Sequence, residues 1–294
     1  MKHTLRGWSC VCLLFFCMSP GRAQEQPPQA PEPPGPQAPK QPTPPPLPPR
    51  PPDVKMPDEA RLSLGVWGWI STGQPVYDAG YAAASTEDAH VRIPGKSGTG
   101  YGASASLPAG EHNSIRITYF ETKSTGSFIA PNNLNLWSVP FTQGDAVSTY
   151  YHLRGGKLSY EFVSWPFPIG SRHFRFKTLY QVQYAKIDSN FTAPLSTTAT
   201  IPAAGSKTII LPSLGVGVTD YLSRYIHVDA NASGFMIPHH GALGDADASI
   251  SFRFSKLELQ LGGRLYYFKT STSSDYYMKG TLAGPIVGLK YYLN

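Results

Sequence analysis

Residues 256–267 alternate strictly between apolar and polar side chains. The polar positions are Lys256, Glu258, Gln260 and Arg264, and the apolar ones between them are Leu257, Leu259, Leu261 and Leu265, followed by Tyr267. A period of two residues places the leucines on one face of an extended strand and the charges on the other. Such a strand suits a soluble sheet over a core, and it equally suits a barrel wall with lipid outside and a polar lumen inside. The number and spacing of similar segments decide between the two.

Similar segments follow one another along residues 58–294, separated by connections that are alternately long and short. An even number of strands with this rhythm is typical of an antiparallel up-and-down barrel, whereas a β-sandwich would mix in Greek-key crossings. Every apolar face is free of charge, and nearly every opposite face holds a charge, an amide, a hydroxyl or a glycine. We therefore predict an all-β fold, a closed transmembrane barrel of about ten strands, at 61–70, 100–107, 115–119, 149–162, 174–184, 208–219, 226–233, 246–254, 256–267 and 287–293.

One segment breaks its own alternation. In residues 149–162 the apolar side chains of Tyr151 and Leu153 stand at odd positions, whereas those of Leu158, Tyr160 and Phe162 stand at even ones. The parity switches at Gly155–Gly156, as one extra residue in a β-bulge would make it do. The sequence thus predicts a bulge at this glycine pair.

The face opposite the lipid carries many ionisable side chains. They favour an internal network of salt bridges and hydrogen bonds that fills a narrow barrel, since barrels near eight strands are just wide enough for side chains to fill. The alternative is a narrow channel for small solutes, leaning towards anions because the cations outnumber the acids. The predicted lumen residues are Arg116, Arg154, Lys157, Glu161, Arg175, Lys177, His227, Asp229, Asp247, Arg253, Lys256, Glu258, Arg264 and Lys290.

A hydrolytic site at the barrel rim is a weaker hypothesis. His227 and Asp229 share one face of their strand, and His239, His240, Asp245 and Asp247 follow in the next connection and strand. A His–Asp pair can activate water, but no matching acid pair stands on the opposite rim, and adjacent histidines rarely point at one ion. We therefore predict a protein that is not an enzyme and has no catalytic residues, metal site or cofactor.

Aromatic residues also occur where they should lie beside or beyond the membrane. Tyr101, Tyr119, Tyr180, Tyr184, Tyr267 and Tyr291 stand near strand ends, where interfacial aromatic girdles belong. The long connections 71–99 and 123–147 contain Tyr77, Tyr81, Phe128, Trp137 and Phe141. These rings are expected to pack on one another as a lid, or alternatively to present a binding surface for a partner, a glycan or a phage.

The first 57 residues differ from the rest. Residues 1–23 have the charge pattern, the apolar run and the small-residue cleavage site of a secretory signal peptide. All 3 cysteines of the chain fall within them, so the mature protein can have neither disulfides nor thiol chemistry. Residues 24–57 hold more than half of the 29 prolines, which predicts an extended periplasmic linker, with peptidoglycan or a periplasmic protein as a further partner to consider.

Composition narrows the function classes. The formal charge is +6, but Lys2, Arg6 and Arg22 lie in the predicted signal peptide. The remaining excess is too small for the basic footprint of a nucleic-acid-binding protein, so no nucleic-acid partner is expected. Only 15% of the residues are charged, against roughly 25% in ordinary globular proteins.

Over residues 60–294 the chain resembles small bacterial outer-membrane β-barrel proteins of the OmpA/OmpW-like kind. The last strand carries the residues that match the C-terminal assembly signal of this class, Gly288, Tyr291 and Leu293. The resemblance implies a location in the bacterial outer membrane, contact with its lipid, insertion by the barrel-assembly machinery, a periplasmic N-terminus and surface-exposed long loops. It favours a structural or interaction role for the barrel.

Overall fold

The computed structural model describes residues 61–79, 90–94, 98–110, 112–165, 173–196, 201–272 and 276–293. They belong to one structural unit, Arg50–Asn294. The predicted signal peptide (1–23) and the Pro-rich linker (24–57) lie outside the described residues. None of the described residues belongs to a helix that is long and apolar enough to cross a membrane.

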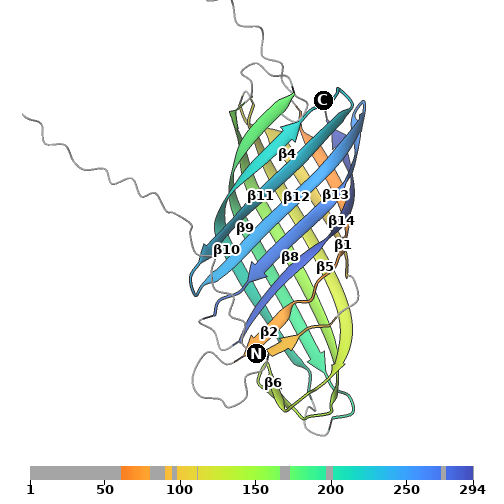
Figure 1. The fold of residues 1–294 in the computed structure, drawn as a ribbon, viewed down its shortest axis with the longest axis vertical. Helices are drawn as coiled ribbons and strands as arrows, with labels where there is room; N and C mark the ends of the chain where they lie inside the picture. The colour runs from red at the N-terminus through yellow and green to blue at the C-terminus, as the bar shows by residue number, and fades with distance from the viewer. Residues whose placement is uncertain are drawn as a thin grey trace, which may run out of the picture. The chain divides into compact units, whose positions relative to one another are not determined.

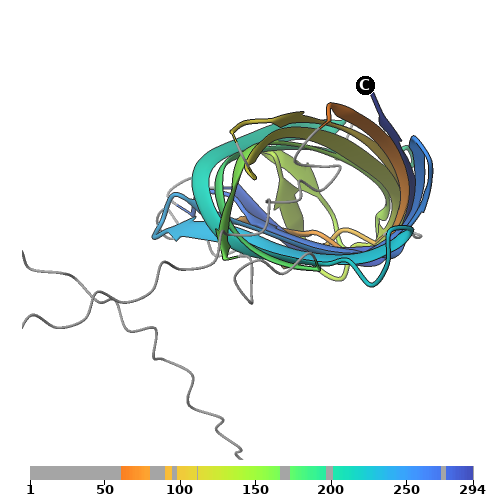
Figure 2. The ribbon, with the colours of Figure 1, turned by 90° about the horizontal axis from the view of Figure 1, so that it is seen from above.

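Ten antiparallel strands form a closed barrel (Figures 1 and 2), in which each strand pairs with the strands that precede and follow it along the chain. The barrel closes where the last strand pairs with the first, with Leu64 opposite Tyr291. The prediction of a closed up-and-down β-barrel of about ten strands is therefore confirmed. The strands are β1 (Ser63–Ser71), β4 (Gly98–Pro108), β5 (Ser114–Ile129), β8 (Ala146–Trp165), β9 (Phe174–Thr192), β10 (Ala203–Asp220), β11 (Ile226–Ile237), β12 (Gly241–Phe254), β13 (Leu257–Lys269) and β14 (Tyr276–Tyr292).

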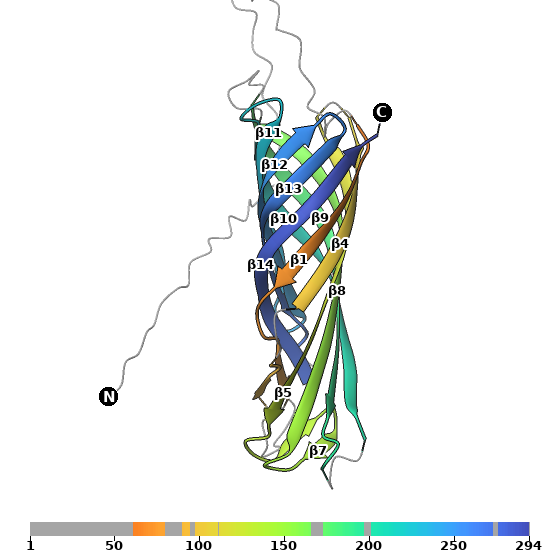
Figure 3. The same ribbon diagram turned by 90° about the vertical axis from the view of Figure 1, so that its right-hand side faces the viewer.

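The strands differ greatly in length, and Figure 3 shows β1 and β4 ending partway along the barrel while β5 and β8 run on. Strand β8 has 20 residues, which corresponds to about 65 Å of extended chain. A tilt of about 40° leaves a height of roughly 50 Å, well above the roughly 30 Å of a bilayer core. The barrel therefore extends beyond the membrane at the end that carries the long connections.

Four short strands complete this far end. Strand β2 (Val76–Ala79) pairs with β14 beyond the point where β1 ends, and β3 (His90–Arg92) pairs with β2. Strands β6 (Leu134–Leu136) and β7 (Val139–Phe141) form a hairpin between β5 and β8. We call the part of the barrel beyond the membrane the crown. It comprises residues 72–79, 90–94, 121–154, 185–196, 201–210, 236–243, 267–272 and 276–281, and the remaining strand residues form the membrane zone.

The outer wall of the membrane zone is apolar. Leu257, Leu261 and Leu265 on β13 are 43%, 39% and 44% exposed, whereas Glu258 and Arg264 point inward and are buried. The alternation in residues 256–267 is thus confirmed with the leucines outside. Exposed apolar side chains continue around the barrel at Leu64, Val66, Ile70, Leu107, Ile115, Ile117, Leu158, Phe162, Val182, Leu214, Val216, Val228, Ile250, Val287 and Leu289, and exposed tyrosines at 101, 119, 180 and 291 lie on the same wall.

The bulge prediction at Gly155–Gly156 is wrong. Strand β8 keeps a continuous register through these glycines with both β5 and β9, and its irregularity lies between Val163 and Trp165. Odd-numbered side chains point inward from Val147 to Glu161, so Tyr151 and Leu153 are buried inside the barrel while Leu158 faces lipid. In the membrane zone the apolar side chains of β8 point outward to lipid, and in the crown they point inward because water is outside. The apolar positions therefore switch from even to odd numbers although the strand has no bulge there.

The predicted long connections are partly strand. The connection expected at 123–147 shortens to the residues between Ile129 and Ala146 and holds the β6–β7 hairpin. Strands β9 and β10 likewise extend into the connection expected at 187–206. Polar outward residues such as Lys123, Thr125 and Ser127 look like a loop in the sequence, but they form the water-facing wall of the crown.

We expect a charge on the outer wall to be costly in the membrane zone and harmless in the crown. Leu261→Arg places a cation against lipid and should lower the free energy of unfolding by about 2–4 kcal/mol. Thr125→Arg, on the outer wall of the crown, is the matched control and should change it by less than about 0.5 kcal/mol. Urea unfolding of the two variants in lipid vesicles measures both values. Equal costs would show that the two positions share one medium and would contradict the division into zones.

Candidate functional site

The lumen is occupied at mid-height by one charged layer. Arg264 on β13 binds Asp245 on β12 in a bidentate pair, with Nε to Oδ1 and Nη2 to Oδ2 both at 2.9 Å. Lys157 on β8 donates to the same carboxylate at 2.7 Å. The Arg264 and Asp245 side chains are 5% and 2% exposed. A carboxylate buried in this way is stabilised by its two cationic partners, because an unpaired buried charge is strongly unfavourable.

Aromatic rings surround the same guanidinium. The Arg264 Cζ atom lies 4.0 Å from the ring centre of Phe120, 5.0 Å from that of Trp67, 5.6 Å from that of Trp69 and 5.7 Å from that of Tyr266. Cations at such distances are attracted by the ring faces. The Phe120 ring also packs edge-on against Trp69 and Tyr266. We call Trp67, Trp69, Phe120, Lys157, Asp245, Arg264 and Tyr266 the middle layer.

Glycines make room for these rings on the neighbouring strands. Trp67 pairs in register with Gly102, and a Cβ atom there would lie 2.2 Å from the indole. Phe120 pairs with Gly155, where a Cβ atom would lie 2.1 Å from the ring. Because Gly102 and Gly155 have no side chain, the rings of Trp67 and Phe120 can lie against the barrel wall at these positions.

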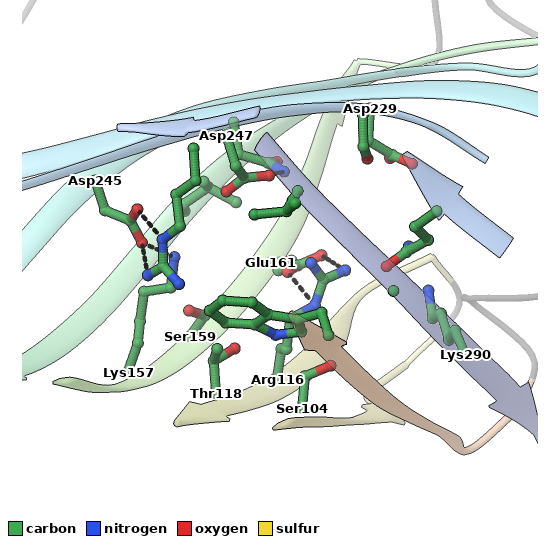
Figure 4. A pocket seen from close by; sticks show the side chains of 18 of the residues that line it. Ser104, Arg116, Thr118, Lys157, Ser159, Glu161, Asp229, Asp245, Asp247 and Lys290 are labelled. Carbon is green, nitrogen blue, oxygen red and sulfur yellow. Dashed lines mark hydrogen bonds and ion pairs between the residues drawn. The ribbon is translucent and has the colours of Figure 1, made fainter. Parts of the chain in front are cut away.

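A polar cavity of about 110 Å³ lies between the middle layer and the end with the short turns. Figure 4 shows Asp245 and Lys157 at one side of it, Lys290 at the other, and Arg116 and Glu161 between them. Glu161 receives hydrogen bonds from Arg116 Nη2 at 3.2 Å and from Ser114 Oγ at 3.3 Å, and Lys177 Nζ lies 3.6 Å away. The space is large enough for several water molecules.

A second buried network closes the lumen near the short turns. Glu258 accepts hydrogen bonds from Arg253 Nη2 and from Tyr292 Oη, both at 2.8 Å. His227 Nε2 lies 2.9 Å from Asp229 Oδ2 and 3.6 Å from Glu258 Oε1. The lower lumen is thus filled by paired charges and does not present a lining of one sign.

The interior of the crown is mainly apolar, with a few buried hydroxyls such as those of Ser124 and Ser189. Buried side chains from the barrel wall, among them Leu153, Ile187 and Phe268, pack against the β6–β7 hairpin through Leu136 and Phe141. Tyr77 on β2 contacts the rings of Trp137, Phe191 and Tyr276 at centroid distances of 5.3, 5.6 and 6.0 Å. The expected packing of Tyr77, Phe128, Trp137 and Phe141 is confirmed, while Tyr81 lies outside the described residues.

Trp137 is the tip of the hairpin and is held from several sides. Its backbone N–H donates to Tyr77 Oη at 2.8 Å and its Nε1 donates to Ser189 Oγ at 2.9 Å. The indole lies over Gly205, where a Cβ atom would be 2.3 Å away. Trp137 and Ser138 have φ values of 49° and 66°, a left-handed conformation that is costly for a bulky side chain. Burial raises the pKa of Tyr77, so its hydroxyl stays neutral and can accept the Trp137 N–H.

The predicted lumen residues fall into clear groups. Arg116, Glu161 and Lys177 meet one another, Lys157 and Arg264 meet at Asp245, and His227, Asp229, Arg253 and Glu258 meet near the short turns. Asp247 accepts a hydrogen bond from Asn231, Arg175 donates to the Phe174 carbonyl, and Lys290 lies over the Tyr292 ring.

Two predicted lumen cations lie elsewhere. Lys256 occupies the turn between β12 and β13, where its carbonyl accepts the Tyr292 N–H. Arg154 points outward and pairs with Asp188. Asp245 was not predicted as a member of the lumen network because it precedes the expected strand 246–254. Trp67 and Trp69 could have been predicted as lumen residues from the sequence, because the alternation of the first strand places them on the face opposite its apolar residues.

The histidines of the hydrolase hypothesis do not come together. His227 is near the short turns, whereas His239 and His240 lie in the connection between β11 and β12 in the crown. No three His, Cys, Asp or Glu side chains in the described part of the chain are arranged to hold a metal ion.

Neither a protein-family model nor a curated protein matches the chain. Among solved structures, the outer membrane protease OmpT from Escherichia coli matches with a TM-score of 0.53 and 8% identity, over 80% of this chain and 97% of that one. The attachment invasion locus protein Ail of Yersinia pestis gives a TM-score of 0.33 and 8% identity, over 79% and 99% of the two chains. The P. putida toluene transporter TodX gives 0.32 and 8%, over 80% and 91%.

At this identity the likeness to OmpT concerns the fold alone, and the activity in its name does not transfer. The fold agrees with the lipid-facing wall of the membrane zone, which is apolar over about nine residues of β13, Leu257–Leu265, as a membrane-spanning strand requires. The chain is therefore a bacterial outer-membrane β-barrel. We expect its short turns to face the periplasm and its crown to face the outside of the cell, as is usual for barrels of this kind.

We expect Arg264 and Asp245 to be strongly coupled. Arg264→Met should lower the free energy of unfolding by about 3 kcal/mol, the lower end of the range for breaking a buried ion pair, because Lys157 stays bound to Asp245. The double variant Arg264→Met with Asp245→Asn should lose at least about 1 kcal/mol less than the sum of the single variants. Urea unfolding in lipid vesicles gives all three values.

The control for this cycle is Lys256→Met, which removes a cation from the periplasmic turn and should change stability by less than about 0.5 kcal/mol. Additive costs for Arg264 and Asp245 would mean that the two side chains act independently, contrary to the bidentate geometry.

Proposed function

We propose that this protein is a sealed outer-membrane barrel whose role is carried out by its crown, as a structural or interaction protein. The observation that carries the proposal is that the lumen is filled at three heights, by the network around Glu258 near the short turns, by the middle layer and by the aromatic interior of the crown. An ion that crossed the barrel would have to displace buried ion pairs first and then enter an apolar region without its hydration shell. Each step is strongly unfavourable.

The outside of the crown supports an interaction role. Ile129 at the end of β5 is 71% exposed, and Leu195 and Ile201 in the β9–β10 connection are 92% and 63% exposed, which is unusual for large apolar side chains outside a membrane. Ser196 Oγ donates to Asp145 Oδ2 at 2.8 Å and so joins the β9–β10 connection to the end of the β5–β8 connection. This bond and the Thr142 N–H lower the pKa of Asp145. These exposed apolar side chains thus lie at the outer end of the crown, on connections that are joined by a hydrogen bond.

A narrow channel is the second candidate. The polar cavity below the middle layer favours it, because its lining includes Arg116 and Lys290 and would hold water. A channel would require the middle layer and the hairpin to move aside together. A barrel hydrolase has less support, because His227 is buried near the periplasmic turns.

Conductance distinguishes the first two candidates. The full-length wild-type protein, refolded and placed in planar bilayers, is expected to give no unitary current steps. Replacement of residues 131–144 by a Gly–Ser linker removes the hairpin, Arg264→Ala with Asp245→Ala opens the middle layer, and Arg253→Ala with Glu258→Ala opens the network near the short turns. Since the three obstructions lie in series, any one or two of these changes should leave the barrel closed, and all three together should produce steps.

The matched control combines the hairpin replacement with Arg253→Ala and Glu258→Ala, which removes a buried ion pair outside the middle layer. It should remain closed. Stable steps from the wild-type protein would overturn the sealed-barrel proposal in favour of the channel.

The last strand supports a further proposal, recognition by the barrel-assembly machinery. Tyr291 points outward and is 44% exposed, Gly288 lies against Trp67, and the Leu293 N–H donates to the Leu62 carbonyl at 2.8 Å. Tyr291→Ser should reduce insertion into the outer membrane of living cells several-fold while refolding into synthetic vesicles stays unchanged. The same substitution at Tyr180, elsewhere on the outer wall, should leave both unchanged. Equal losses in cells and in vesicles would mean that Tyr291 serves folding alone.

A further inference from the structure

The boundary between the membrane zone and the crown is marked on the outer wall by tyrosines followed by charges. On β13 the outward series runs from Leu265 through Tyr267 to Lys269, and on β5 it runs from Tyr119 to Glu121 and Lys123. Tyrosine rings prefer the level of lipid headgroups. The first charges beyond them therefore lie where the phosphates of the outer leaflet are found.

A groove opens on this boundary where β1 ends. The chain turns away from the barrel wall after Ser71, and β2 takes over the pairing with β14. The groove left at this junction is lined by Thr72, Arg92, Tyr267, Lys279 and Thr281, among others. Gly73 lies in the turn with a φ of 120°, and a Cβ atom there would be 2.2 Å from the Thr281 carbonyl oxygen. The turn thus needs a glycine to stay close to β14.

The cations of this groove lie in one row across the strands. Arg92 pairs in register with Val76, Val76 with Lys279, and Lys279 with Lys269. Lys279 Nζ is bound to Asp78 Oδ2 at 2.8 Å and lies 5.5 Å from the Tyr277 ring centre. Asp78 is buried, whereas Arg92 is exposed and the Lys279 side chain is 36% exposed. Arg92 and Lys279 thus line the groove, Lys269 follows in the same row outside its lining, and Lys279 is already paired with Asp78.

We propose that this groove binds the phosphate of a membrane lipid of the outer leaflet. Arginine recognises phosphate oxygens in a bidentate manner and lysine supplies a point charge, so Arg92 and Lys279 together match a phosphate monoester. The groove opens sideways into the headgroup region. The exposed side chains of Ile70, Leu265 and Val287 below it offer the acyl chains an apolar wall. A lipid satisfies both surfaces at once, whereas a free phosphate would satisfy the cations alone.

Native mass spectrometry of the full-length protein, released from detergent micelles that contain bis-phosphorylated lipid A, tests the proposal. The wild type should retain one lipid at low lipid-to-protein ratios. Arg92→Gln with Lys279→Gln should bind about 25-fold more weakly, since each cation near a headgroup contributes about a factor of five. Millimolar inorganic phosphate should not displace the lipid. Displacement would assign the site to free phosphate and overturn the lipid proposal.

The matched control is Lys123→Gln with Lys186→Gln, which removes two cations at the same boundary on β5 and β9. It should change the affinity by less than about twofold, because the groove is intact. An equal loss in both double variants would mean that the lipid responds to the overall charge of the boundary, and the groove would then carry no site. Heat-modifiable migration on a gel shows that each variant is folded. None of these outcomes depends on whether the lumen is sealed.

Discussion

The structure depends on one constraint: a strand in a closed barrel has fixed inner and outer faces, while the medium outside this barrel changes partway along. Strand β8 obeys it plainly. Its outward residues are Phe162, Tyr160 and Leu158 in the membrane zone and Arg154 and His152 in the crown. Where the outer face of the barrel wall is polar and meets water, the wall gains stability only from an inner face that is apolar and packed. The filled interior of the crown therefore follows from the extension of the barrel beyond the lipid.

The middle layer lies where the two interiors meet. On the side of the short turns the lumen is filled by paired charges, and on the crown side it is filled by apolar side chains. Arg264 suits both surroundings, because its guanidinium edge binds Asp245 while its faces contact aromatic rings. A lysine would offer a point charge without these flat faces. The glycines opposite Trp67 and Phe120 provide the space for the rings, so charge pairing and ring packing are built by the same few strands.

The barrel itself could be predicted from the sequence, because lipid-facing positions must be apolar at every second residue and the lengths of the connections alternate. The crown could not be predicted in the same way. Periodicity reports which face is apolar but not which medium the other face meets, so the exchange at Gly155 resembled a bulge. The polar outward residues of β5 resembled a loop for the same reason, and their strand character comes from pairing with β8. Asp245 and Arg264 are 19 residues apart, and only the register of β12 with β13 brings them together.

The barrel is taller than a membrane requires, and this extra height is the feature most closely related to the proposed function. A strand of about ten residues is enough to cross the membrane, yet β8, β9 and β10 have 20, 19 and 18. If the extension served passage of a solute, its interior would need polar groups or water along the path. It holds instead Leu153, Ile187, Phe268 and their neighbours in contact with a strained hairpin tip. Such packing stabilises the wall of the crown and leaves no polar path for a solute through the described residues of its interior. This favours the proposed interaction role, in which the crown acts through its outer surface, held in a fixed form above the lipid.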